Sequence, residues 1–261
     1  MKVSVLTNDL SIKGFDSEHG LSLYINMPKY NILFDTGMTS IYLENAKRLG
    51  VDILNVDYIV LSHGHYDHMG GLVYFPKDNN VKEVVLHKDV FLEKFARDPK
   101  IRFNGVPYKK SDLDFFKLQE FESFFEVDSN FYVISDIIHP MNQNKYYVGE
   151  TLDDFHDELI LVLEENNELT LFMGCSHYGV KYGIERVKKE FPNRRIKNIF
   201  AGMHLINASN EEIANLGEYL NTLNFDLLVP LHCTGERAMK HFKKLYLDKC
   251  LLLQAGDEIK C

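Results

Sequence analysis

The stretch YIVLSHGHYDHMGGL, from Tyr58 to Leu72, takes an apolar strand directly into a cluster of histidines. After the apolar run come His63, His65, Asp67 and His68, all within six positions. Burying an imidazole or a carboxylate is costly unless the group has a partner. A turn after a strand has no need of three imidazoles and a carboxylate. The stretch therefore predicts that a metal ion gathers these side chains.

The spacing of the motif indicates how the ligands divide. His63 and His65 are two residues apart, so in extended backbone both rings point to one side and can share an ion. Asp67 and His68 follow the turn and can face a second ion. Imidazole with carboxylate suits zinc, and also iron or manganese. We expect one or two zinc ions, which would activate a water and clamp a substrate oxygen.

The composition of the 261 residues narrows the class of protein. Hydrophobic content is 45% and charged content 26%, as in soluble globular enzymes. A net charge of -9 argues against a nucleic-acid partner but leaves room for a local pocket that binds a small phosphorylated molecule. No apolar run is long enough to span a bilayer, and MKVSVLTNDL lacks the features of a signal peptide. We expect a cytoplasmic protein with no membrane contact; a homo-oligomer stays open.

The order of elements predicts an α/β (α+β) fold with two sheets and helices outside them. Strands alternate with helices in each half, and the chain 1–261 reads as a single domain. The residues from about 100 to 149 lack a clean period and read as an insertion, which either covers a site or elaborates the surface. Expected helices lie at 40–50, 89–97, 179–191 and 236–246, with another beginning at Ser209 and one at about 70–76.

Unusual polar residues recur where apolar strand runs end. They are Asp35, the His63–His68 motif, Cys175, His177, His204 and His232. Loops at strand ends commonly carry functional groups because the sheets hold them rigidly. The recurrence predicts that these residues contribute to a functional site.

These motifs resemble the metallo-β-lactamase superfamily. SHGHYDHMGG is similar to its metal-binding signature, and ILFDTG to the aspartate-containing turn upstream. EHGLSLYI, FMGCSHYGV, AGMHLI and PLHCTGERAM resemble the subgroup of 7,8-dihydropterin-6-methyl-4-(ribofuranosyl)aminobenzene-5′-phosphate synthase. The resemblance implies an αββα sandwich with a one- or two-metal site at the sheet edge.

The resemblance also implies roles for residues. His63, His65, Asp67 and His68 match the signature, and His232 matches the superfamily's last metal histidine. The usual bridging aspartate is replaced here by Cys175, which is either a soft thiolate ligand or a small buried residue. We expect His177, not His156, to be the middle ligand, because His177 follows a strand and His156 lies in an acidic turn.

Four other residues have expected roles near the ligands. His204 and His19 could contact metal or substrate, or be structural. Asp35 is expected to hold a ligand histidine in place, and Thr234 to support the site from beside His232. Asp67 is the expected catalytic group, orienting the attacking water or taking its proton.

Three functions follow from these expectations. The first is hydrolysis of a small phosphorylated or ester substrate by metal-activated water. The second is a dihydropterin-type transfer that releases pyrophosphate. The third is a metal-dependent ligand sensor without catalysis.

Overall fold

The computed structural model describes residues 1–78, 80–97, 99–140 and 145–261. By internal contacts the chain divides into two compact units. Unit 1 comprises Met1–Glu122, Pro140–Glu158 and Gln254–Cys261, and unit 2 comprises Ser123–His139 and Leu159–Leu253. Each unit has its own large sheet and its own apolar core. A single domain over 1–261 stays a prediction.

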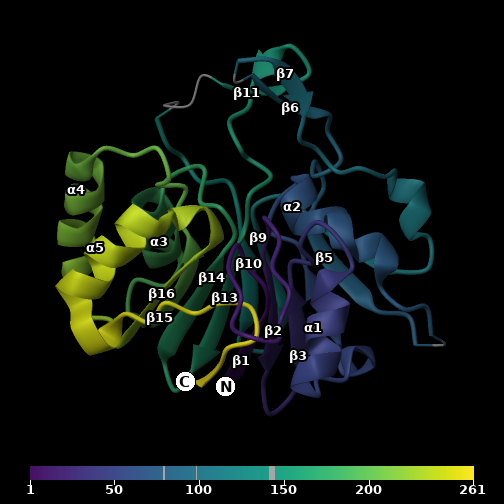
Figure 1. The fold of residues 1–261 in the computed structure, drawn as a ribbon, viewed down its shortest axis with the longest axis horizontal. Helices are drawn as coiled ribbons and strands as arrows, with labels where there is room; N and C mark the ends of the chain where they lie inside the picture. Colours follow the sequence, from purple (N-terminus) through teal and green to yellow (C-terminus); the bar gives the residue numbers. More distant parts are fainter. Residues whose placement is uncertain (79, 98, 141–144) are drawn as a thin grey trace. The chain divides into compact units, whose positions relative to one another are not determined.

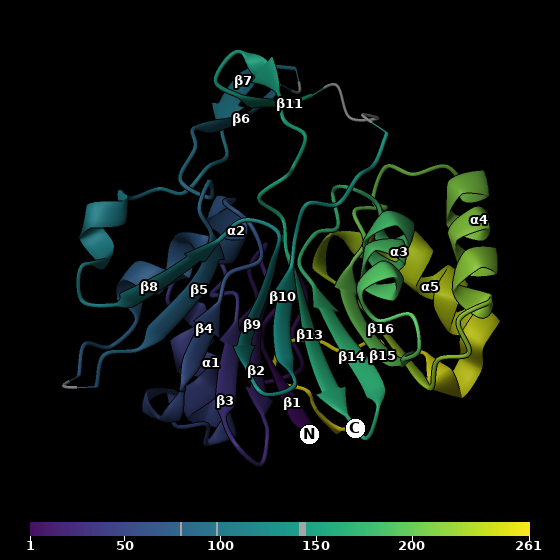
Figure 2. The same ribbon diagram turned by 180° about the vertical axis from the view of Figure 1, so that it is seen from behind.

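Unit 1 is built on a seven-stranded sheet (Figure 2). Its order is β17 (Glu258–Lys260), β1 (Lys2–Thr7), β2 (Ser22–Asn26), β3 (Asn31–Phe34), β4 (Tyr58–Val60), β5 (Glu83–His87) and β8 (Lys117–Phe121). β2 and β3 form the antiparallel hairpin expected from the sequence, and β3, β4, β5 and β8 run parallel. The parallel strands therefore end at one edge, where Asp35 and the histidine motif begin.

Helices of unit 1 cover this sheet with apolar side chains. They are α1 (Ile41–Leu49), α2 (Tyr66–Met69) and the 3-10 helices η1 (Ile53–Asn55), η2 (Gly70–Tyr74) and η3 (Lys110–Leu113). Tyr42 and Ala46 of α1 pack in one core with Leu33 and Ile59 of the strands. The helix expected from about residue 70 is thus a short 3-10 turn.

A second, four-stranded sheet in unit 1 overturns one expectation. It contains β12 (Thr151–Leu152), β11 (Tyr146–Val148), β6 (Lys94–Arg97) and β7 (Ile101–Phe103). The prediction of a helix over 89–97 is wrong, because residues 94–97 form the strand β6. Phe95 stands opposite Tyr147 and Phe103, and the Phe95 and Phe103 rings are 5.6 Å apart. These cross-strand aromatic contacts outweigh the helical spacing of the sequence.

Unit 2 is built on a six-stranded sheet. Its order is β16 (Leu227–Leu231), β15 (Arg195–Gly202), β14 (Glu168–Met173), β13 (Ile160–Glu165), β10 (Phe131–Ile134) and β9 (Phe124–Asp128). The β13–β14 hairpin turns at Asn166 and Asn167, both with positive φ, as asparagine tolerates. Residues 100–149, expected to be an insertion, supply β7 to β11, so much of this segment belongs to the sheets.

Three helices lie along the sheet of unit 2 (Figure 1). They are α3 (Val180–Glu190), α4 (Asn210–Asn221) and α5 (Glu236–Tyr246). Two 3-10 helices flank α5, namely η4 (His232–Thr234) before it and η5 (Leu247–Lys249) after it. Ser209 caps α4 in a capping box with Glu212, as expected. Ile184, Ile213 and Phe242 bring the three helices into one apolar core with the strands.

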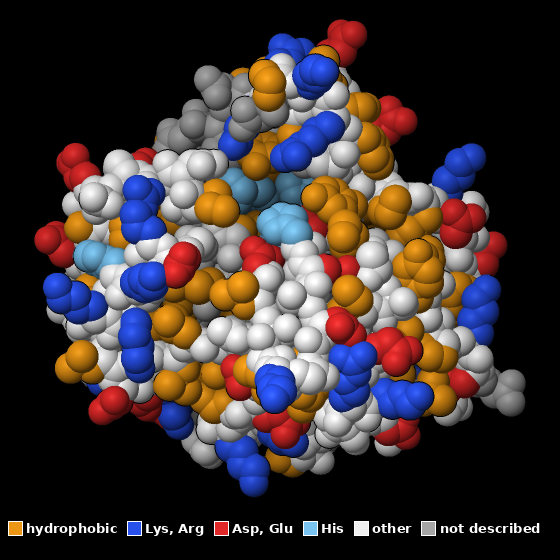
Figure 3. Space-filling model, viewed as in Figure 1, with side chains coloured by type: hydrophobic (Ala, Val, Ile, Leu, Met, Phe, Trp, Pro, Cys, Tyr) orange, Lys and Arg blue, Asp and Glu red, His pale blue; other side chains and the backbone are white. Residues whose placement is uncertain are grey.

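The surface carries charges of both signs. Acidic and basic side chains are interspersed over the face shown in Figure 3. Within the part of the chain that the structure describes, no helix is long and apolar enough to cross a membrane.

Candidate metal centre

The histidine motif of unit 1 is buried at the end of β4. His63 and His68 have no exposed surface, and His65 is 4% exposed. His65 leads directly into α2, whose short turn carries Asp67 and His68 back towards the strand. The His63 Nε2 and His65 Nδ1 atoms lie 3.0 Å apart, as the same-side spacing of the two residues predicts.

A chain of hydrogen bonds assigns the tautomers of these rings. Asp35 only accepts, so the Ser62 hydroxyl donates to its Oδ2 at 2.7 Å. The Ser62 oxygen then accepts from His63 Nδ1 at 2.9 Å, which leaves the lone pair of His63 on Nε2. His65 Nε2 accepts from Asn104 Nδ2 at 3.1 Å, so the proton of His65 is on Nδ1 and points at His63.

This geometry fits a metal ion. Two ligands of a tetrahedral zinc ion, each 2.0–2.1 Å from it, lie about 3.3 Å apart. The 3.0 Å between His63 Nε2 and His65 Nδ1 is close to that separation, so one ion can replace the proton they share. Burial, with the charge of Lys94 adding to it, lowers the pKa of His65 to about 3. The ring is therefore neutral near pH 7, as a metal ligand must be.

Asp35 holds the third histidine of the motif. Its Oδ2 accepts from His68 Nδ1 at 2.7 Å, and its Oδ1 accepts from the Ser62 amide at 2.7 Å. The proton on Nδ1 leaves Nε2 of His68 as the atom that can bind an ion. A carboxylate behind a histidine in this way is the usual partner of a metal-ligating imidazole. The contact expected for Asp35 is present.

Asp67 lies between two histidines. Its Oδ2 is 3.3 Å from His19 Nε2 and 4.0 Å from His68 Nε2. The ring of His19, 53% exposed, also lies 3.3 Å from Asp9 Oδ1 through its Nδ1. His19 therefore contacts the motif through a carboxylate and stays open to solvent. This position suits a residue that meets substrate.

A buried charge network that the sequence did not reveal supports the motif from behind. Asp157 Oδ2 accepts from the Gly64 amide at 2.9 Å, and its other oxygen accepts from Lys94 Nζ at 2.8 Å. Lys94 also donates to Asp153 at 2.8 Å. A Cβ on Gly64 would lie 2.0 Å from the Val90 carbonyl, so only glycine fits there. These partners are far apart in sequence, and no local pattern announces them.

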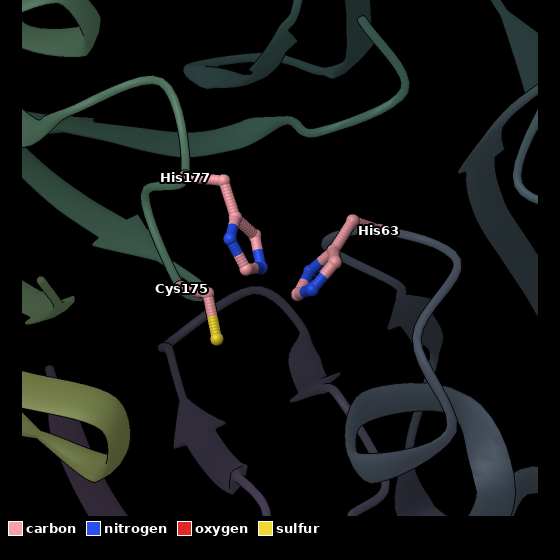
Figure 4. A group of neighbouring side chains, drawn as sticks. All are labelled: His63, Cys175 and His177. Carbon is pink, nitrogen blue, oxygen red and sulfur yellow. The ribbon is translucent and has the colours of Figure 1, made fainter. Parts of the chain in front are cut away.

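A second group of metal-binding residue types lies in unit 2. Cys175 and His177 project from the turn after β14 (Figure 4). Cys175 and His177 are 3% and 5% exposed. The His177 and His204 rings lie 4.4 Å apart, which brings together two of the residues expected at the site.

Cys233 joins this group, although the sequence offered it no role beyond its place beside His232. One donor atom from each of Cys175, His204 and Cys233 lies within 4.8 Å of the others. The Cys233 thiol donates to the Cys175 carbonyl at 3.6 Å and accepts from the His204 amide at 3.3 Å. Two thiols and an imidazole form a soft set that suits zinc or iron.

His232 and Thr234 follow β16. His232 is 2% exposed. The Thr234 hydroxyl donates to the Leu231 carbonyl at 2.7 Å and accepts from the Met203 amide at 3.1 Å. Thr234 therefore ties the ends of β15 and β16 together beside His232.

Both groups contain residues with left-handed backbone. Asp35 in unit 1 has φ 58°, and in unit 2 Ser176, His204 and His232 have φ 54°, 48° and 45°. Non-glycine residues adopt this conformation at a cost, and such strain concentrates at functional sites. The loops that contain these four residues therefore hold their side chains in place at a cost in conformational energy.

His156 has the acidic setting expected from its sequence. Its Nδ1 donates to Asp154 at 2.6 Å, and its side chain is 40% exposed. The pair is part of unit 1, where His156 also meets Asp89 and His87.

The chain is similar to known proteins in sequence and in fold. A family model described as the metallo-beta-lactamase superfamily matches residues 18–136. The 7,8-dihydropterin-6-methyl-4-(beta-D-ribofuranosyl)-aminobenzene-5'-phosphate synthase of Methanocaldococcus jannaschii is 32% identical over 276 residues, covering 94% of this chain and 91% of that protein.

Solved structures of other proteins are also similar to this chain. The crystal structure of Tm1679, described as a metal-dependent hydrolase of the beta-lactamase superfamily, is 32% identical with a TM-score of 0.87. The match covers 100% of this chain and 99% of that chain. YhfI from Bacillus subtilis, a metallo-beta-lactamase fold protein, has a TM-score of 0.63 at 14% identity over 99% of each chain, a likeness of fold alone.

Proposed function

The chain belongs to the metallo-β-lactamase superfamily and has its fold, as the sequence predicted, and from this premise we propose that it is a metal-dependent hydrolase. The proposed substrate is a small molecule with a phosphate or an ester. The observation that carries the proposal is the buried pair His63 Nε2 and His65 Nδ1, 3.0 Å apart. The description of Tm1679, similar over the whole chain, supports the reaction class.

The proposed metal ligands are two sets of residues: the first is His63, His65, Asp67 and His68 of the histidine motif, and the second is His177 and His232. The match of the motif to the superfamily signature supports the first set. The left-handed backbone conformation of His232 and the burial of His177 support the second set. Zinc suits the imidazoles, and iron or manganese would also fit.

A bound ion of this class would make a water acidic near neutral pH and would act as a Lewis acid on the substrate oxygen. The chain's own residues do the rest. In this proposal Asp67 orients the nucleophile and takes its proton at Oδ2. His19, 3.3 Å from that oxygen, can pass the proton to solvent or to the leaving group because its ring is half exposed. Asp35 keeps His68 in one tautomer throughout.

A second candidate function is the transfer reaction of the dihydropterin type. The synthase relative, 32% identical over nearly the whole chain, is the observation that favours it. In that reaction a ribofuranosylaminobenzene phosphate replaces water as the nucleophile and pyrophosphate leaves. The same residues would act, with the acceptor in the position of the water.

Metal content tests the centre. We expect wild-type protein to retain a tightly bound transition metal after gel filtration. The double variant His63→Ala, His65→Ala should lose it, and so should His177→Ala. His241→Ala, a partly exposed histidine of α5, is the matched control and should retain it. If His177→Ala keeps the full metal content, His177 is not a ligand.

Product analysis separates the functions. A hydrolase releases alcohol or phosphate from a panel of esters, thioesters and phosphate esters with water alone. A transferase releases pyrophosphate from a dihydropterin pyrophosphate only when the aromatic acceptor is present. A protein that turns over neither, yet holds a small molecule tightly, would be the sensor, and both enzymatic proposals would fall.

A further inference from the structure

Three residues of unit 1 outside the histidine motif also gather metal-binding atoms. His87 ends β5, Asp89 follows it in the next turn, and His156 lies in the segment 153–158. One donor atom from each lies within 4.8 Å of the others. We propose that His87, Asp89 and His156 form a separate peripheral site for a divalent ion of the zinc class.

The distances suit one ion. His156 Nε2 is 3.1 Å from Asp89 Oδ2, and His87 Nδ1 is 3.9 Å from the same oxygen. The two values bracket the separation of about 3.3 Å between ligands of a tetrahedral zinc ion. Two imidazoles and a carboxylate are also a ligand set that zinc accepts. Only a small movement of side chains would close the site.

Both imidazoles are already oriented by their other nitrogen. His87 Nε2 donates to the Glu122 carbonyl at 3.0 Å, and His156 Nδ1 donates to Asp154 Oδ1 at 2.6 Å. Metal-ligating histidines almost always have such a partner on the second nitrogen. The remaining nitrogens, His87 Nδ1 and His156 Nε2, are the ones that face Asp89. His87 Nδ1 now accepts a 3.2 Å bond from the Asp89 amide, which an ion would replace.

The exposure of the three side chains leaves one side of the site open to water. His87 is 3% exposed, whereas Asp89 and His156 are 30% and 40% exposed. An ion held by three protein ligands can therefore complete its shell with solvent.

An ion here would brace the histidine motif. The turn after β5 carries Val90, whose carbonyl packs on Gly64 so closely that a Cβ would come within 2.0 Å of it. The segment 153–158 carries Asp157, whose Oδ2 accepts from the Gly64 amide at 2.9 Å. His87 and Asp89 lie at the turn after β5, and His156 lies in the segment 153–158. An ion bound by all three would hold these two segments together and so fix Gly64 from both sides, without contacting the proposed catalytic centre.

Zinc stoichiometry of the full chain tests the site. The proteins are equilibrated with buffered Zn²⁺, and metal per chain is measured by mass spectrometry. We expect His156→Ala to hold one ion fewer than wild type and than the control His241→Ala. The variant His63→Ala, His65→Ala should keep this peripheral ion, so loss of the proposed centre and loss of this site are distinguishable. Equal stoichiometry in His156→Ala and wild type would overturn the inference.

Asp89→Asn gives an independent measurement, because it keeps the shape of the residue and removes its negative charge. Zinc affinity of the peripheral site should fall by at least the roughly 10–100-fold that loss of an outer partner causes. Circular dichroism confirms that each variant is folded. Unchanged affinity in folded Asp89→Asn would also overturn the inference.

Discussion

Asp35 and His68, 33 residues apart in sequence, are joined by a 2.7 Å hydrogen bond between the carboxylate Oδ2 and the imidazole Nδ1. Neither side chain has any exposed surface. The same carboxylate accepts from the amide and the hydroxyl of Ser62. One buried group thus sets the tautomer of His68 and, through Ser62, that of His63. The protonation pattern of the histidine motif therefore depends on Asp35, which directly follows β3.

Asp35→Asn should weaken metal binding by roughly 10–100-fold. An amide has one acceptor oxygen where the carboxylate has two, so it cannot serve Ser62 and His68 together. Competition with a chromophoric chelator measures the affinity. Asp248→Asn, at an exposed aspartate after α5, is the control and should bind as wild type does. Wild-type affinity in Asp35→Asn would show that the tautomer of His68 is set elsewhere.

Asn104→Leu should weaken metal binding about tenfold, whereas Asn104→Asp should bind nearly as wild type. Asn104 donates to His65 Nε2, and its Oδ1 is buried with no hydrogen-bond partner among the described residues. When Nδ1 of His65 binds an ion, the proton lies on Nε2 and needs an acceptor. Rotation of the Asn104 amide supplies Oδ1, and an aspartate does the same. Equal affinities of the Leu and Asp variants, by the same chelator competition, would contradict this.

Lys94→Met should lower the free energy of unfolding by about 3–5 kcal/mol. Lys94 is 1% exposed and lies 2.8 Å from both Asp153 and Asp157. Burial lowers the pKa of Lys94, but the two carboxylates outweigh it and leave the pKa above its usual value. Without the ammonium, two buried carboxylates face each other uncompensated. Urea denaturation followed by circular dichroism gives the free energy. Lys88→Met, at an exposed ion pair with Glu122, should change little, and an equal loss there would refute the argument.

Glu168→Gln should remove a part of the stability that depends on pH. Hydrogen bonds from Lys197 and Arg195 hold the pKa of Glu168 below its ordinary value of 4.5. A depressed carboxyl pKa contributes stability above the unfolded value, and that contribution disappears as pH falls through the folded value. The difference in melting temperature between wild type and variant should therefore be present at pH 6 and decrease steadily as the pH falls below 4.5. It should also shrink in high salt, because the three side chains are partly exposed.

Glu218→Gln, at an exposed glutamate of α4, provides the comparison and should follow wild type at every pH. A Glu168→Gln difference that stays constant with pH would mean that packing, and not charge, is lost.

The elements that the sequence predicted well are those with a clear period or a cap. The β2–β3 hairpin, α1, α3, α5 and the capping box of α4 lie where their patterns place them. β6 was misread because its spacing is helical, while its strand state depends on Tyr147 and Phe103 across the sheet. Such partners are set by the fold and are invisible in a local window.

The residues of the proposed site also divide into those that the sequence predicted and those that it did not. The close approach of His63 and His65 follows from two-residue spacing after a strand, and Asp35 was expected to hold a histidine. The thiol of Cys233 and the Lys94–Asp157 support were not foreseen. Neither has a spacing signature, because the bonds of Lys94 span 59 and 63 residues and those of Cys233 span 58 and 29.

The sequence by itself determined the family, the elements with a clear period or a cap and the residue types offered to a metal, because periodicity and the histidine motif are local. Tertiary structure alone decided which atoms meet. It brought Asp35 to His68, Lys94 to Asp157, and His156 to Asp89 across 67 residues. Contacts at such separations are made when elements pack, and packing depends on the whole chain at once. No short stretch can specify them, since each residue's partner lies on an element formed elsewhere.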